Sequence, residues 1–117
     1  MFQLFFSVIQ FLSKIKLNMY TYRKPKDAKE AIKLVETAGV NVSWDICVPK
    51  QIDQSQVYFN HYKPIVFIYK NDKLVGAAHG KTGRPTIYDV SDRDVTSTYN
   101  KLVLNEIDTE LKQLELF

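Results

Sequence analysis

The sequence predicts a single α/β domain in which a βαβ unit is followed by a β-hairpin and a C-terminal helix on a mixed sheet. Three observations carry this prediction. Residues 64–80 hold two apolar runs separated by Asn71 and Asp72, which are residue types that tolerate positive φ. Apolar residues recur at helical spacing over 28–38, and they alternate with polar ones over 40–48. An α+β protein with an antiparallel sheet is the alternative.

Composition sets limits on the class of protein. With 117 residues, 45% of them apolar and 25% charged, the chain is long enough for one folded domain with its own core. A net charge of +3 is too small to indicate nucleic-acid binding by itself. Cys47 is the only cysteine, which excludes an intrachain disulfide and a C-x-x-C pair. We therefore expect a reducing, cytoplasmic setting.

Residues 1–18, MFQLFFSVIQFLSKIKLN, differ in composition from the rest, so we expect a globular domain over 19–117 preceded by a separate apolar segment. The segment lacks a basic stretch before its apolar run and a small-residue cleavage site, and its apolar run is too short to span a bilayer. Three interpretations remain, in order of preference. The segment lies upstream of a true start at Met19, it packs on the core as a helix, or it lies on a membrane surface.

The first half of the domain reads as strand, helix and strand. Tyr20–Arg23 forms a short strand, and Pro25 suits the first turn of a helix that runs over 28–38 and ends at Gly39. The alternation over 40–48 predicts a strand with one buried face, formed by Val40, Val42, Trp44, Ile46 and Val48.

The second half contains the hairpin and the last helix. Residues 50–63 read either as a short helix or as an irregular loop, and Thr86–Val90 as an edge strand. Ser91 and Asp94 have the spacing of a capping box, which predicts that a long helix starts there. Its expected buried face consists of Val95, Tyr99, Leu102, Val103, Ile107, Leu111 and Leu114.

Two stretches, YTYRKPKDAKEAIKLVETAGVNVSWDICV and YKPIVFIYKNDKLVGAAHG, give the chain a family resemblance. The first is similar to the opening βαβ unit of glutaredoxins, and the second to their proline followed by a hairpin that ends in glycine. The chain thus resembles the thioredoxin and glutaredoxin-like fold, which implies that Pro64 is a cis-proline. Where that family places C-x-x-C or C-x-x-S, this chain has Lys26, Asp27 and Ala28, so the resemblance implies a scaffold without redox activity.

Enzyme chemistry finds little support in the sequence. Cys47 with His61 or His79 is a conceivable nucleophile and base, although a cysteine between apolar strand residues is usually a small buried hydrophobe. The two histidines with Asp45 or Asp89 match no metal-ligand spacing. We therefore expect no catalytic residues, no metal and no cofactor, and we keep a Cys-dependent enzyme as a third hypothesis.

The loop GKTGRPT, residues 80–86, allows three interpretations. Its glycines with Lys81 and Thr82 suggest a phosphate cradle, but the P-loop spacing is absent. Gly83, Arg84 and Pro85 match a minor-groove arm. The plain interpretation, which we favour, is a flexible connection with solvated charges.

Two surfaces are candidates for binding. A basic surface would serve nucleic acid and comprises Arg23, Lys24, Lys26, Lys29, Lys33, Lys81 and Arg84. An aromatic surface would serve a protein partner and comprises Tyr58, Phe59, Tyr62 and Pro64. Our leading hypothesis is a small interaction or regulatory protein without catalysis that binds a macromolecular partner, preferably a protein. A nucleic-acid-binding module is the alternative.

Overall fold

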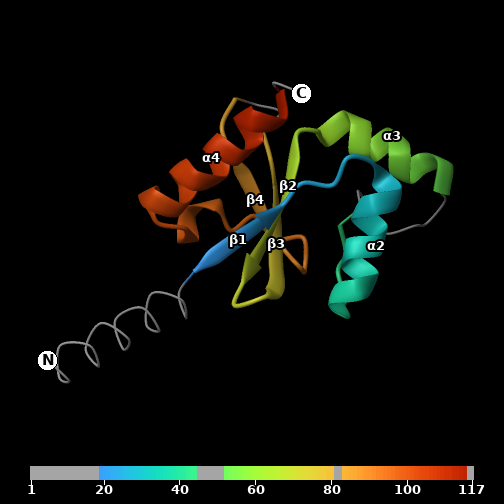
Figure 1. Cartoon of the computed structure of the whole chain (residues 1–117), viewed down its shortest axis with the longest axis horizontal. Helices are drawn as coiled ribbons and strands as arrows, with labels where there is room; N and C mark the ends of the chain where they lie inside the picture. Colours follow the sequence, from blue (N-terminus) through green and yellow to red (C-terminus); the bar gives the residue numbers. More distant parts are fainter. Residues whose placement is uncertain (1–18, 45–51, 81–82, 116–117) are drawn as a thin grey trace, which may run out of the picture.

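The computed structural model describes residues 19–44, 52–80 and 83–115. Figure 1 shows how the elements lie around one sheet. In chain order they are β1 (Tyr20–Arg23), α2 (Ala28–Ala38), α3 (Ile52–Tyr62), β2 (Ile65–Lys70), β3 (Lys73–His79), β4 (Thr86–Asp89), the 3₁₀ helix η1 (Thr96–Thr98) and α4 (Lys101–Glu115). The expectations for residues 1–18, for Cys47 and for Lys81 concern positions outside the described residues.

The four described strands form one antiparallel sheet in the order β1-β2-β3-β4. Together with the helices it makes a mixed α and β domain, and the sheet is the antiparallel one of the alternative. β2, β3 and β4 follow one another as a meander. β1 also pairs with β2, although α2 and α3 lie between these two strands in the sequence. The two short strands β1 and β4 are the edges of the sheet.

β2 is apolar on both of its sides, and helices cover both faces of the sheet. Ile65 and Phe67 belong to a core with α2 and α3, whereas Val66 and Ile68 belong to a second core with Ile107 of α4. Figure 1 shows α4 on one side of the sheet and α2 and α3 on the other. Each fully buried side chain of this size contributes about 1.5–3 kcal/mol, so the central strand stabilises both layers.

The predicted hairpin is confirmed. Asn71 and Asp72 both have positive φ, 53° and 63°, which is the conformation of a two-residue turn between β2 and β3. The strands begin directly after a cis peptide bond between Lys63 and Pro64, as the family resemblance implies.

A β-bulge interrupts the ladder between β2 and β3. Ile68 pairs with Gly76 and Tyr69 pairs with Leu74, so Val75 is the extra residue. After the bulge, Ala77 returns to the face of Leu74, which places both in the core under α2 and α3. Since side chains alternate along a strand, His79 points to that face as well.

The helix predicted over 28–38 is confirmed with the same bounds. Asp27 is its N-cap and accepts a hydrogen bond from the Glu30 N–H at 2.8 Å, while Gly39 ends the helix with a φ of 67°. Residues 52–62, for which helix and loop were both open, form α3. The two helices are joined where the Ala28 N–H donates to the Gln56 side chain at 3.0 Å.

The strand predicted over 40–48 is wrong for the part that the structure describes. Residues 40–44 are not a strand, and 45–48 lie outside the described residues. The alternation reflects an extended segment lying on the protein rather than a ladder in the sheet, because Asn41 and Ser43 are exposed and Trp44 is buried. The Ser43 N–H donates to the Val90 carbonyl, which holds the segment beside the end of β4.

The start predicted for the last helix is also wrong. Asp94 accepts hydrogen bonds from the N–H and hydroxyl of Thr96, and this local turn leads into η1 instead of an α-helix. The helix begins at Lys101 after Asn100, whose side chain accepts from the Val103 N–H at 2.9 Å. Val103, Ile107 and Leu111 share one face of the helix and are buried as expected, whereas Leu102 lies off this face and is 73% exposed.

Candidate functional site: an aromatic pocket beside β3 and β4

A pocket of about 130 Å³ lies on the sheet face that α2 and α3 cover. Segments distant in the sequence contribute to it: the extended segment 40–44, the end of α3, the second half of β3, β4 and the turn after β4. We call it the aromatic pocket, and its lining residues are Trp44, Tyr62, Ala77, Ala78, His79, Tyr88 and Asp92.

The floor of the aromatic pocket is open because Ala77 is small. Ala77 pairs with Tyr88 across β3 and β4, so the two side chains lie next to each other on the same face of the sheet. A methyl group between larger neighbours leaves space that a Val or Leu side chain would fill. The bulge at Val75 is what brings Ala77 and His79 to this face.

The rings around the pocket form a contiguous row. The ring of Tyr62 lies 5.4 Å from that of His79, and His79 stacks on Tyr88 at 5.8 Å with an angle of 24° between the rings. On the other side of Tyr62, His61 makes an edge contact at 5.0 Å. These distances are typical of favourable aromatic pairs, so each ring restrains its neighbour.

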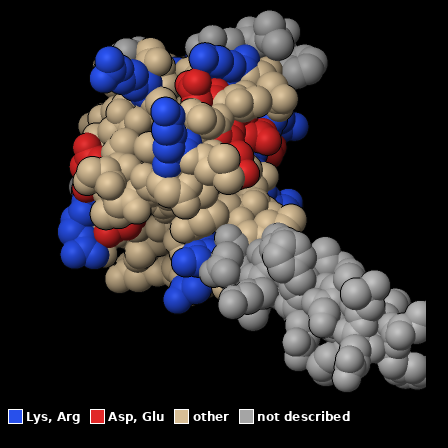
Figure 2. Space-filling view, turned by 90° about the vertical axis from the view of Figure 1, so that its left-hand side faces the viewer, with Lys and Arg blue, Asp and Glu red and all other residues tan. Residues whose placement is uncertain are grey.

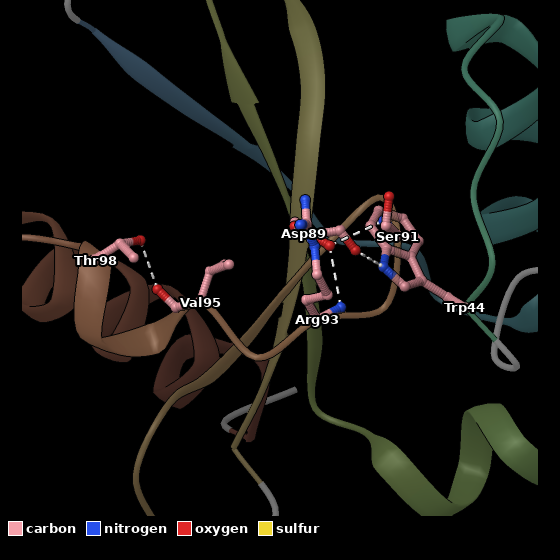
Figure 3. Close-up of polar contacts among 6 residues, drawn as sticks. All are labelled: Trp44, Asp89, Ser91, Arg93, Val95 and Thr98. Carbon is pink, nitrogen blue, oxygen red and sulfur yellow. Dashed lines mark hydrogen bonds and ion pairs between the residues drawn. The ribbon is translucent and has the colours of Figure 1, made fainter.

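Trp44 forms a fixed wall of the pocket. Its side chain is 2% exposed, it packs 5.5 Å from the ring of Phe67, and its indole N–H donates to the backbone carbonyl of Asp89. Figure 3 shows the indole reaching the turn that follows β4. The burial predicted for Trp44 is confirmed.

The turn after β4 is built around the Asp89 carboxylate. It accepts hydrogen bonds from the N–H groups of Ser91 and Arg93 at 2.9 and 3.0 Å and pairs with the Arg93 Nε at 2.9 Å. Burial opposes ionisation of Asp89, but the backbone donors of Arg93 and Ser91 and the Arg93 charge outweigh it and lower the pKa of the carboxyl. The turn holds Asp92, with a φ of 62°, at the rim of the pocket.

Two carboxylates influence the pocket electrostatically. Burial raises the pKa of the Tyr88 hydroxyl, and the negative charges of Asp94 and Asp92 raise it further. Hydrogen bonds from Thr96 lower the pKa of the Asp94 carboxyl, and His79 contributes to the same shift. Both acids are therefore close enough to place negative potential on this side of the pocket.

The residues predicted as a partner surface are only partly together. Tyr62 lines the aromatic pocket, and Tyr58 is 42% exposed one turn earlier on α3. Phe59 lies on the side of α3 that faces the sheet, and it is 3% exposed in the core there. It is therefore not available to a partner. Pro64 is half-buried, and its carbonyl accepts from the Gly80 N–H at 3.2 Å.

The residues predicted as a basic surface do not form one patch. Lys24 is engaged with Glu110 of α4 at 2.7 Å, and a hollow lined by Arg23 and Lys24 also contains Glu30 and Asp72. Lys26, Lys29 and Lys33 are exposed around α2, while Arg84 precedes β4 at the edge of the sheet opposite β1. Figure 2 shows the face on the α4 side, where Lys, Arg, Asp and Glu side chains lie around an uncharged area.

The enzyme and metal hypotheses gain nothing from the geometry that the structure describes. Cys47 and Asp45 lie outside the described residues, and the Asp89 carboxylate is bound within its turn. Among residues 19–44, 52–80 and 83–115, no group of three or more His, Cys, Asp or Glu side chains has the arrangement of a metal site. None of the described helices has the length and apolar character needed to cross a membrane.

Sequence reasoning missed most of the pocket. The sequence suggests His79 only as a base or metal ligand and Trp44 only as a core residue, and it assigns no role in a site to Tyr88 or Asp92. One signal was present in the sequence: Gly76 inside an apolar strand is typical of a bulge, and a bulge re-aims the side chains that follow it. Which aromatic residues would gather above Ala77 is decided by contacts between distant segments.

Comparison with known proteins gives no relative for this chain: no family model matches it, and neither a curated protein nor a solved structure does.

Proposed function

We propose that this protein is a small binding module that holds a partner protein by taking one of its side chains into the aromatic pocket. The observation that carries the proposal is the pocket itself, with aromatic walls, an alanine floor and a carboxylate at its rim. Rigid aromatic side chains around a pocket are typical of the residues that dominate binding energy at protein interfaces.

The size of the pocket favours a single side chain as its occupant. Pockets for drug-sized molecules and cofactors have volumes of about 300–1,000 Å³, whereas an engineered protein cavity of about 150 Å³ takes up benzene. A volume of about 130 Å³ is in the second range. The pocket would thus hold one anchor residue, with the rest of the partner on the surrounding surface.

The walls of the pocket are held in place before any partner binds. Trp44 is fixed by its hydrogen bond to Asp89, and His79 and Tyr88 belong to paired strands. A preorganised site loses little side-chain freedom on binding, which favours affinity from a small contact.

The surface next to the pocket extends along α3. Tyr58 precedes Tyr62 by four residues and therefore lies on the same side of the helix, and the neighbouring Val57 is 65% exposed. These side chains add exposed apolar area beside the anchor site. A partner that fills the pocket would cover them.

Three related expectations stay proposals. A thioredoxin-like scaffold is supported by the hairpin, and it is weakened by the lack of a strand over 40–44. A cytoplasmic location rests on the single cysteine. Nucleic-acid binding is less favoured than protein binding, because the basic residues are dispersed and Lys24 is paired with an acid.

The proposal is tested by selecting peptides from a random library on the full chain and measuring their affinity for variants. Ala77→Val, which fills the floor, should weaken the selected peptides at least tenfold, and Leu102→Ser, on the opposite side of the sheet, should not. Because Ala77 is buried, Tyr62→Ala serves as a second pocket variant, and thermal unfolding shows that each variant is folded. Peptides that bind both pocket variants as tightly as the wild-type chain would refute the proposal.

A further inference from the structure

Resting on the proposed function, we infer that the side chain taken up by the aromatic pocket is cationic, an ammonium or guanidinium group on an apolar stem. Two features of the site point to this chemistry. The pocket presents aromatic rings on several sides, and it has a carboxylate among its lining residues.

The rings supply the first contribution. Trp44, Tyr62 and Tyr88 all line the pocket, and Trp is the ring that attracts a cation best, followed by Tyr. A cation within about 6 Å of such a ring is held by the negative potential of its face, and several rings around one cavity add their contributions. Leu, Ile and Met side chains could line a pocket for a purely apolar anchor equally well, whereas the walls of this pocket are aromatic rings.

The carboxylates supply the second contribution. Asp92 is among the lining residues, and the backbone of Asp94 pairs with that of Tyr88 in an isolated β-bridge, while its carboxylate accepts from Thr96. Burial is the first cause of the raised pKa of the Tyr88 hydroxyl, and the negative charges of Asp94 and Asp92 raise that pKa further. A positive charge at the same place is favoured by the same potential.

The floor of the pocket explains why the cation would carry an apolar stem. Ala77 offers its methyl group and Ala78 only its backbone at the bottom, because the Ala78 side chain belongs to the core on the other face, and a bare hydrated ion would lose its water there without replacement. Lysine, methylated lysine and arginine keep their charge while burying carbon atoms. Methylated ammonium groups are weakly hydrated, and they are recognised by aromatic cages elsewhere in proteins.

The experiment compares four probes on the full chain, the N-acetyl amides of lysine, Nε-trimethyllysine, arginine and norleucine. Norleucine has an apolar stem without charge and is the matched control. Trp44 is the only tryptophan, so its fluorescence reports on the pocket, and the methyl signal of Ala77 provides a second readout by NMR. Titrations at constant ionic strength separate site binding from general salt effects.

At least one cationic probe should bind about fivefold or more tightly than norleucine. Asp92→Asn should reduce that ratio at least twofold. The three cationic arms distinguish an ammonium, a methylated ammonium and a guanidinium source. Equal or tighter binding of norleucine would overturn the inference, and so would a cation preference that Asp92→Asn leaves unchanged.

Failure of this inference and failure of the proposed function give different results. If norleucine binds as well as the cations and Ala77→Val abolishes its binding, the pocket accepts an apolar side chain and the binding module stands. If no probe binds and the selected peptides tolerate the pocket variants, both proposals fall.

Discussion

Asp89 is the residue on which the arrangement of the aromatic pocket depends most. Its backbone carbonyl fixes Trp44, its carboxylate shapes the turn that presents Asp92, and its N–H donates to the Arg93 carbonyl at 2.9 Å. One residue thus connects the wall and the rim of the pocket. Figure 3 shows these contacts converging on it.

Asp89→Asn should destabilise the protein by about 1–2 kcal/mol at neutral pH, because an amide cannot replace charge-assisted acceptance from Ser91 and Arg93. The folded-state pKa of Asp89 is lowered, so its contribution is present above the ordinary aspartate pKa of about 3.9 and is lost as pH falls through the folded value. The wild-type chain should therefore lose more stability than Asp89→Asn on going from pH 5 to acid. Denaturant unfolding over that range measures the difference.

Arg93→Gln is the control for this effect. It removes the exposed guanidinium charge and leaves both backbone donors, so its cost should be within about 1 kcal/mol. If it costs as much as Asp89→Asn, the surface ion pair and not the turn carries the stabilisation.

Trp44→Ala should lower the free energy of unfolding by about 3–5 kcal/mol, because a large buried ring leaves a cavity against Phe67. Trp44→Phe keeps part of the packing but removes the indole donor to Asp89, and its cost should be smaller. Chemical denaturation of both variants tests this, and a change near zero for Trp44→Ala would contradict the buried position.

At the scale of elements, the bulge in β3 decides which side chains reach the pocket. Gly76 follows the extra residue of the bulge, and a Cβ at its position would lie 2.8 Å from the Tyr88 carbonyl oxygen. Only glycine lets β3 and β4 approach here. The pairing of Ala77 with Tyr88, and with it the pocket floor, follows directly after this contact.

Gly76→Ala should destabilise the protein by about 1–3 kcal/mol, because the new methyl group meets a backbone atom that cannot move aside alone. Gly80→Ala is a matched control: its nearest contact would be the Leu111 side chain at 3.5 Å, an ordinary van der Waals distance. Thermal unfolding of the two variants compares them. Equal stability of both would show that β3 and β4 can separate without cost.

The sequence determined the local elements well and the tertiary ones poorly. Asn71 and Asp72 define their turn, and Asp27 and Gly39 define the ends of α2, through interactions that span a few residues. The segment over 40–44 alternates like a strand, yet its neighbour is the end of β4. Alternation of apolar and polar residues indicates that one side of the segment is buried, but it does not indicate which part of the protein covers that side.

At the scale of the whole molecule, the helices on each face give the sheet two separate cores. The aromatic pocket belongs to the core under α2 and α3, while α4 and β1 are joined on the other side where the Tyr22 hydroxyl donates to Glu106 at 2.7 Å. Pocket substitutions can therefore change one core without disturbing the other. The pocket could not be predicted because its walls come from segments on both sides of the hairpin.

The strand order also has a consequence for the route by which the chain folds. The meander from β2 to β4 joins neighbours in sequence, but β1 can pair with β2 only after the intervening chain with α2 and α3 has closed a long loop. Closing that loop costs entropy before the new contacts stabilise it, so the meander should form first and β1 should add late.

Refolding and unfolding rates test this order. Leu74→Ala in β3 should mainly slow folding, while Tyr22→Phe in β1, which removes the hydroxyl bond to Glu106, should mainly speed unfolding. The reverse result would mean that β1 takes part in the nucleus. With the expected result, the strand nearest the N-terminus of the described chain would be the last to join the sheet and the first to leave it.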